Sequence, residues 1–171
     1  GRTYAEEAGI SLRDTPAPLF QLLYTALLLS ARISASLAVQ AARALREAGY
    51  TTPEKMADAT WQDRVDVLTA HGYKRYDEST SRFLGATSAL LLERYGGDLR
   101  KLRAEADGDV GAMHTALKAF KGIGDVGANI FLREVQGVWR EVHPFADALV
   151  LRAAGRLGLP EGADELAGLV T

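Results

Sequence analysis

The segment Gly122-Ile123-Gly124 holds the residue types best suited to binding chemistry in this chain. Helical patterns flank these three residues, so the link forms a tight hairpin, in which both glycines permit a positive φ at low steric cost. Such a turn exposes backbone N–H groups at the start of the second helix, where the positive end of the helix dipole also lies. These donors suit one phosphate group, which predicts sequence-independent binding of a nucleic-acid backbone.

Basic side chains close to the hairpin support the same interpretation. Lys118 and Lys121 flank it, and Arg133 and Arg140 follow further along the chain. The formal net charge of −2 gives no support from bulk charge, but a local patch is enough to neutralise a few phosphates. The alternative for each lysine is an ordinary solvated surface charge.

The hairpin segment resembles the helix-hairpin-helix motif of the endonuclease III superfamily of DNA glycosylases, whose usual form is Leu-Pro-Gly-Val-Gly-Arg-Lys-Thr-Ala-Asn. The matching positions are Gly122, Ile123, Gly124, Ala128 and Asn129, with Phe120 in place of the leucine and Lys121 in place of the proline. The resemblance assigns DNA contacts to Lys118, Lys121, Gly122, Ile123, Gly124, Val126, Gly127 and Arg32.

Two further landmarks are similar to the same family. Asp147, followed by Arg152, resembles the segment Val-Asp-Thr-His-Ile-Phe-Arg that carries the family's catalytic aspartate. Upstream, residues 28–34 read Leu-Leu-Ser-Ala-Arg-Ile-Ser and are similar to the family's Leu-Leu-Ser-Ala-Gln-Ala-Thr. The three landmarks occur in the family's order and cover most of the chain.

The resemblance makes Asp147 the candidate catalytic residue. Cleavage of an N-glycosidic bond builds positive charge on the sugar, which a carboxylate opposite the leaving base stabilises while it orients or deprotonates water. The alternative role for Asp147 is to cap the helix expected over 147–157, and one residue can do both. Val126 stands where bifunctional members carry a nucleophilic lysine, so the implied activity is monofunctional, without strand cleavage.

Other positions carry implied roles in base extrusion. Arg32 stands where the family has a glutamine that fills the space of the flipped base, and its alternative is an exposed arginine between helices. Tyr73 and Phe145 are expected to line the base pocket, although most aromatic residues in a helical protein belong to the core. Asp125, where the family often has arginine, could repel phosphate unless it acts as an N-cap.

Capping residues and hydrophobic periodicity indicate helices throughout and almost no strands. The expected helices cover 19–29, 34–48, a short stretch from 52, 60–71, 76–95, 98–104, 109–120, 126–135 and 147–157. The prediction is an all-α, two-lobed helical globule. The resemblance assigns 19–141 to a six-helix barrel, with the helix-hairpin-helix motif at about 110–135. It assigns 1–18 and 142–171 to a smaller lobe and places Asp147 at the cleft.

The composition limits cofactors and compartment. The 171 residues include no cysteine, which excludes the four-cysteine iron–sulfur cluster of many relatives. The chain is therefore expected to belong to a branch without the cluster or to stop before that region. The resemblance leaves room for a monovalent cation at the hairpin. His71, His114 and His143 lack metal-ligand spacing.

The lack of a secretory signal or membrane-length apolar run predicts a cytoplasmic, nucleoid-associated protein.

Three functions follow as hypotheses. The first is a monomeric, monofunctional DNA glycosylase of base excision repair that acts on double-stranded DNA containing a damaged or mismatched base. Its substrate stays open between an oxidised or mismatched pyrimidine and an alkylated purine. The second is a catalytically inactive module that recognises lesions or distorted duplex, and the third is a helical protein-interaction domain.

Overall fold

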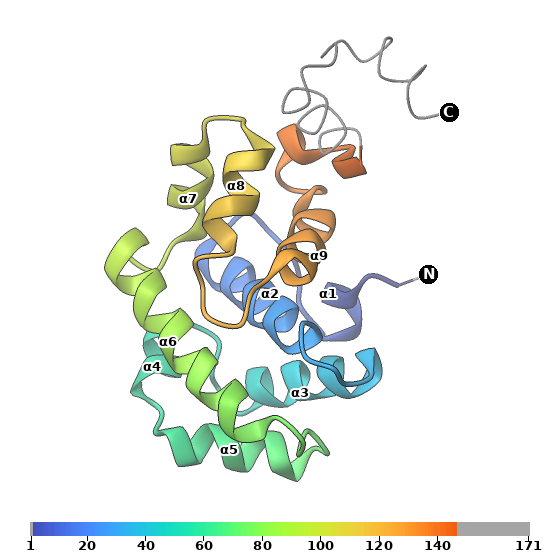
Figure 1. Cartoon of the computed structure of the whole chain (residues 1–171), viewed down its shortest axis with the longest axis vertical. Coiled ribbons are helices and arrows are strands. Elements are labelled where there is room, and N and C mark those ends of the chain that lie inside the picture. The colour runs from blue at the N-terminus through green and yellow to red at the C-terminus, as the bar shows by residue number, and fades with distance from the viewer. Residues whose placement is uncertain (1, 147–171) are drawn as a thin grey trace.

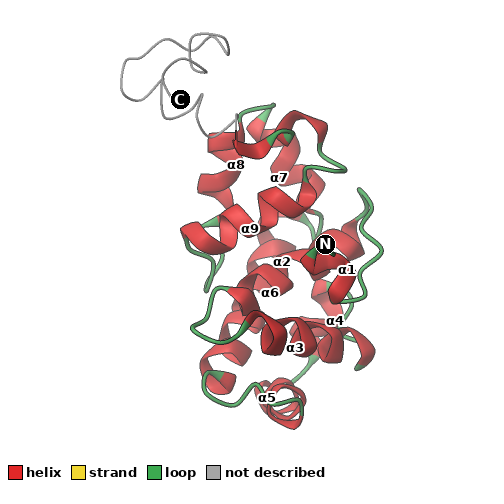
Figure 2. Cartoon of the chain, turned by 90° about the vertical axis from the view of Figure 1, so that its right-hand side faces the viewer, coloured by secondary structure: helices red, strands yellow, loops and turns green. Residues whose placement is uncertain are grey.

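All regular elements in the part of the chain that the structure describes, residues 2–146 of a computed structural model, are helices (Figures 1 and 2). This confirms the all-α class. In chain order they are α1 (Tyr4–Glu7), α2 (Pro16–Leu29), α3 (Ala35–Glu47), α4 (Pro53–Asp58), α5 (Trp61–Ala70), α6 (Asp77–Tyr95), α7 (Leu99–Ala106), α8 (Val110–Leu117), α9 (Asp125–Val135) and the 3-10 turn η1 (Arg140–Val142).

Helix α2 is the centre of the molecule. It contacts α1, α3, α6, α7 and α9, and in both views it lies between α7–α9 at one end and α5 at the other (Figures 1 and 2). Leu19 to Leu28 are buried on every side, which explains why this helix is apolar all round rather than amphipathic. Neither α2 nor any other described helix has the combination of length and apolar character that crossing a membrane requires.

Local capping explains why most helices begin close to the residue expected from the sequence. The Ser34 and Thr52 side chains accept hydrogen bonds from backbone N–H groups in the first turns of α3 and α4. Thr60 and Asp63 form a reciprocal capping box at α5. The larger differences from the expected boundaries are at α2, which begins at Pro16, α7, which ends at Ala106, and α8, which ends at Leu117. Helix α1 lies in a segment where no helix was expected.

A buried arginine holds α6 in place. The Arg64 guanidinium donates hydrogen bonds to the carbonyl oxygens of Met56, Ala59 and Ser81, which links α4 and α5 to α6. These bonds satisfy the C-terminal carbonyls of α4 and replace the water that Arg64 loses. Burial lowers the Arg64 pKa. Gly85 of α6 is required at this contact, because a Cβ there would lie 2.6 Å from Arg64 Nη2.

The two ends of the described chain pack against the body. Arg103 of α7 forms a bidentate pair with Glu141 and a second ion pair with Asp14, whose other carboxylate oxygen accepts the indole N–H of Trp139. The buried apolar residues of 2–18 and 142–146 belong to the same hydrophobic cluster as those of α2 and α9. The division into barrel and smaller lobe stays a prediction, and the helix expected over 147–157 lies outside the described residues.

Candidate nucleic-acid interface

The hairpin between α8 and α9 contains one left-handed residue rather than two. Gly122 has a φ of +88°, a region that is costly for residues with a Cβ. Gly124 has φ −105° and ψ −159°, which other residues also adopt. The expectation that both glycines serve positive φ is therefore wrong for Gly124. Only the first glycine reverses the chain, whereas Gly124 is already the N-cap of α9.

Close packing against α2 and α6 positions the hairpin. A Cβ on Gly122 would lie 3.0 Å from Phe83 Cδ2 and 3.2 Å from Leu27 Cγ, so the backbone approaches both side chains directly. Thr87 of α6 donates its hydroxyl to the Lys121 carbonyl oxygen at 3.1 Å. Ile123 is buried in the core, and its backbone N–H donates to the Phe120 carbonyl oxygen at 3.1 Å, so this residue anchors the turn and offers no donor to a phosphate.

The exposed edge of the hairpin presents unused donors. Among the described residues, no acceptor pairs with the backbone N–H groups of Gly122, Gly124 and Val126. A Cβ on Gly124 would meet nothing within 4 Å, which means that this edge faces open space. The Lys121 side chain is exposed and forms no ion pair with any residue of 2–146. This arrangement suits one phosphate oxyanion.

Asp125 is the first residue of α9 and not its N-cap, which corrects the expected capping role. Its carboxylate pairs instead with Lys118 Nζ at 2.8 Å, and His114 Nε2 lies 3.8 Å from the same oxygen. Both side chains of the Lys118–Asp125 pair are largely exposed, so the pair adds little stability. Its consequence is electrostatic, because Lys118 offsets the negative charge nearest to the hairpin.

Gly127 contributes to packing rather than to the exposed edge. It is buried on the first turn of α9, and a side-chain carbon there would clash with Ser30 Oγ at the end of α2. Val126, one residue earlier, is 63% exposed. The expected DNA-contacting residues of this turn therefore separate into an exposed position, Val126, and a buried one, Gly127.

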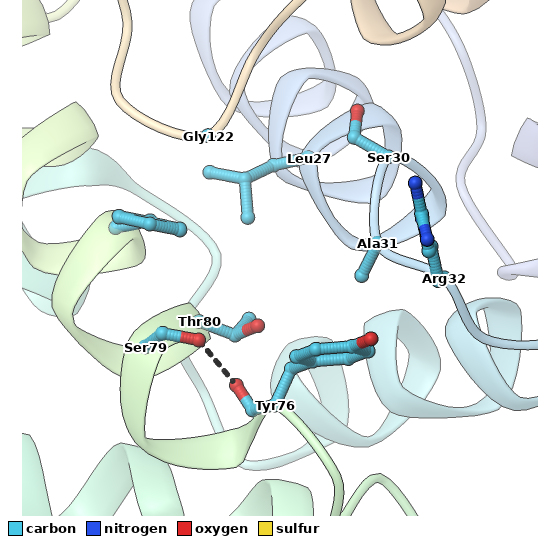
Figure 3. A pocket seen from close by; sticks show the side chains of 9 residues that line it. Leu27, Ser30, Ala31, Arg32, Tyr76, Ser79, Thr80 and Gly122 are labelled. Atoms are coloured by element: carbon cyan, nitrogen blue, oxygen red, sulfur yellow. Dashed lines mark hydrogen bonds between the residues drawn. The ribbon is translucent and has the colours of Figure 1, made fainter.

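A cavity of about 310 Å³ opens beside the hairpin (Figure 3). Its walls come from Leu27 and Ser30 of α2 and Ala31 and Arg32 of the following loop, from Tyr76, Ser79, Thr80 and Phe83 around the start of α6, and from Gly122. The hairpin glycine and the segment 28–34, far apart in the sequence, thus meet at one cavity. Arg32 is exposed at its edge (Figure 3).

Tyr73 does not line this cavity, which corrects the expected base pocket. Its ring is fully buried, its hydroxyl lies 3.4 Å from the Leu28 carbonyl oxygen, and Thr80 donates to it at 3.2 Å. Burial raises the Tyr73 pKa, so the phenol stays protonated. Tyr76, an aromatic candidate that the sequence favours less than Tyr73 and Phe145, has a half-buried ring in the cavity wall. Its position three residues after Tyr73 and directly before α6 was the available signal.

Phe145 lies at a different place from Tyr73. It is buried beside a second cavity of about 390 Å³, where Arg133, Gln136 and Pro144 are its neighbours. The Phe145 backbone N–H donates to Gln136 Oε1. The two expected pocket aromatics therefore do not share a cavity. The catalytic candidate Asp147 lies outside the described residues.

The described residues form no cluster of metal ligands. The chain has no cysteine, and residues 2–146 contain no group of three or more histidine or acidic side chains arranged to hold a metal ion. His71 Nδ1 lies 2.9 Å from the Val67 carbonyl oxygen, within its own helix region. A monovalent cation at the hairpin stays a prediction.

Comparison with known proteins adds no family assignment. No family model, curated protein or solved structure matches the chain. The motifs and the cavity that joins them are therefore the features that bear on function.

Reversing the charge of Lys121 is expected to weaken binding to every DNA duplex by a similar factor. Lys121→Glu removes one phosphate-neutralising cation, so the slope of log affinity against log salt should fall by about 1. Fluorescence anisotropy at several salt concentrations measures both effects. Lys55→Glu on α4 changes the same charge at an exposed position away from the hairpin and is the matched control. Equal effects of the two variants would show that the hairpin does not face DNA.

Proposed function

We propose that this protein is a monofunctional DNA N-glycosylase that binds duplex DNA through the α8–α9 hairpin. The observation that carries the proposal is the cavity bounded by both Gly122 and Arg32. A phosphate held at the exposed hairpin edge would place the adjoining nucleotide beside this cavity. Its volume of about 310 Å³ lies within the usual range of ligand pockets.

Base extrusion requires a pocket and a group that compensates for the lost stacking. Tyr76 and Phe83 provide aromatic surface in the cavity wall, and Arg32 at its edge is long enough to reach a neighbouring base. The hairpin supplies affinity without sequence preference, so selectivity must come from the pocket. This division of roles fits an enzyme that searches duplex DNA for a rare altered base.

The proposed reaction is hydrolysis of the bond between the base and C1′ of the sugar. Asp147 stabilises the positive charge that develops on the sugar and accepts a proton from the attacking water, and the base leaves as the second product. Val126, exposed on the first turn of α9, has no amine to form a Schiff base with the sugar. The product is therefore an abasic site in an intact strand.

A second candidate is a protein that binds lesions without releasing the base. Its specific support is that no carboxylate lines the Gly122–Arg32 cavity among residues 2–146. Asp125, the acidic residue nearest to the hairpin turn, is committed to Lys118. On this alternative, the cavity holds an extruded base for recognition only.

A panel of duplexes that differ only in one altered base distinguishes these functions. We expect abasic sites, revealed as alkali-labile breaks, on at least one duplex, with intact strands before alkali. We also expect no covalent adduct after borohydride reduction, because no amine attacks the sugar. Selective binding without base release would favour the second candidate. Neither binding nor release on any duplex would reject both, and efficient borohydride trapping would reject the monofunctional mechanism.

A further inference from the structure

Positive charge dominates the wall of the Gly122–Arg32 cavity. Arg32 lines it directly, and neither an aspartate nor a glutamate is among its lining residues within 2–146. The Arg75 guanidinium lies 5.3 Å from the centroid of the Tyr76 ring, and that of Arg82 lies 5.9 Å from the Phe83 ring. Both aromatic residues of the cavity therefore already have a cation over their rings.

The acidic residues in the first turn of α6 do not line the Gly122–Arg32 cavity. Asp77 and Glu78 line an adjoining cavity together with Arg75 and Arg82. Asp77 accepts hydrogen bonds from the Thr69 hydroxyl at 2.8 Å and from the Glu78 backbone N–H at 2.7 Å. These carboxylates offset the two arginines of their own cavity and leave Arg32 as the charged group of the Gly122–Arg32 cavity.

Two hydroxyl groups among the lining residues already donate their hydrogens to backbone carbonyl oxygens. Ser30 donates its hydrogen to the Ala26 carbonyl oxygen at 2.7 Å, and Ser79 donates to the Tyr76 carbonyl oxygen at 3.2 Å (Figure 3). Their remaining lone pairs can only accept. The Tyr76 hydroxyl has no partner among residues 2–146 and can donate or accept. Arg32 supplies donors alone.

We infer that Arg32 determines the charge class of the extruded base. The cavity takes a neutral base that carries both carbonyl oxygens and a ring N–H, as uracil and oxidised thymine do. It rejects a base with a fixed positive charge, as 7-methylguanine has. This inference rests on the proposed function. The resemblance implies that Arg32 fills the space that the flipped base leaves in the duplex. The inference adds that Arg32 also forms part of the wall of the base pocket.

The physical reason is repulsion inside a partly desolvated site. A cationic base in the cavity would lie a few ångströms from the exposed Arg32 guanidinium, and the cavity walls would replace part of the water that normally screens the charge of the base. Cation–π attraction, the usual means of binding a cationic base, is weakened because the Tyr76 and Phe83 rings already interact with arginines. A neutral base with carbonyl oxygens gains a hydrogen bond from Arg32 instead.

Single-turnover excision at saturating enzyme tests the inference, because saturation removes differences in general DNA affinity. The three substrates share one sequence and contain uracil opposite guanine, thymine glycol opposite adenine, or 7-methylguanine opposite cytosine, with spontaneous base loss subtracted. The wild type should release uracil or thymine glycol at least about tenfold faster than 7-methylguanine. Arg32→Gln should reduce this ratio, and Arg32→Glu should reduce it further or reverse it.

Arg13→Glu, which reverses an exposed charge outside the cavity lining, is the matched control and should leave the ratio unchanged. Preferential release of 7-methylguanine by the wild type would overturn the inference and leave the proposed function intact. An unchanged ratio across the Arg32 series would also overturn it. Release of no base from a wider panel by a protein that still binds these duplexes would instead reject the proposed glycosylase function.

Discussion

Asp147→Asn should lower the rate of base release by at least about 100-fold while the protein still folds and binds DNA. Asparagine keeps an oxygen that can cap a helix but removes the carboxylate charge that stabilises the developing positive charge on the sugar. DNA affinity should stay the same or increase, because one negative charge near the substrate is lost. Single-turnover excision and anisotropy measure the two effects separately.

Asp109→Asn is the matched control for this substitution. Asp109 is the N-cap of α8, where its carboxylate accepts the Ala112 backbone N–H, so the same chemical change is made at a capping position. This variant should keep base release within a few-fold of the wild type. A rate for Asp147→Asn close to that of Asp109→Asn would contradict the catalytic role of Asp147.

Gly122→Ala should destabilise the protein by about 2–4 kcal/mol, because a Cβ is costly at positive φ and would press against two side chains of the cavity wall. The new methyl group would lie 3.0 Å from Phe83 and 3.2 Å from Leu27. Gly124→Ala is the matched control for stability. Its negative φ is accessible to alanine, but glycine is preferred to alanine at an N-cap, so its free energy of unfolding should fall by no more than about 1 kcal/mol.

The substitutions at the two glycines should also differ in their effect on DNA affinity. The Gly124 methyl group would project into open space at the edge where we place the phosphate. Gly124→Ala should therefore weaken DNA binding by about tenfold, or about 1.4 kcal/mol, with a smaller loss of stability than Gly122→Ala causes. Urea unfolding and anisotropy measure these quantities. Wild-type DNA affinity of a stable Gly124→Ala variant would show that the phosphate does not approach this edge.

The sequence by itself determined the helical class and most helix starts, because these depend on local interactions. The Ser34, Thr52 and Thr60 hydroxyls bond to backbone groups three residues away, so the capping pattern is readable without the fold. The same holds for the tight turn at Gly122-Ile123-Gly124. The activity proposed for Asp147 depends on the family resemblance and stays a prediction.

Only the tertiary structure decided which neighbouring residue faces the cavity. Tyr73 is buried and Tyr76 is half exposed, because the turn before α6 directs one ring to the Leu28 backbone and leaves the other beside Arg32. Gly122 reverses the chain at positive φ, and Phe83 and Leu27 leave little room for a Cβ there, whereas Gly124 has a negative φ and open space beside it. These distinctions depend on contacts between helices far apart in the chain, and no local pattern encodes such contacts.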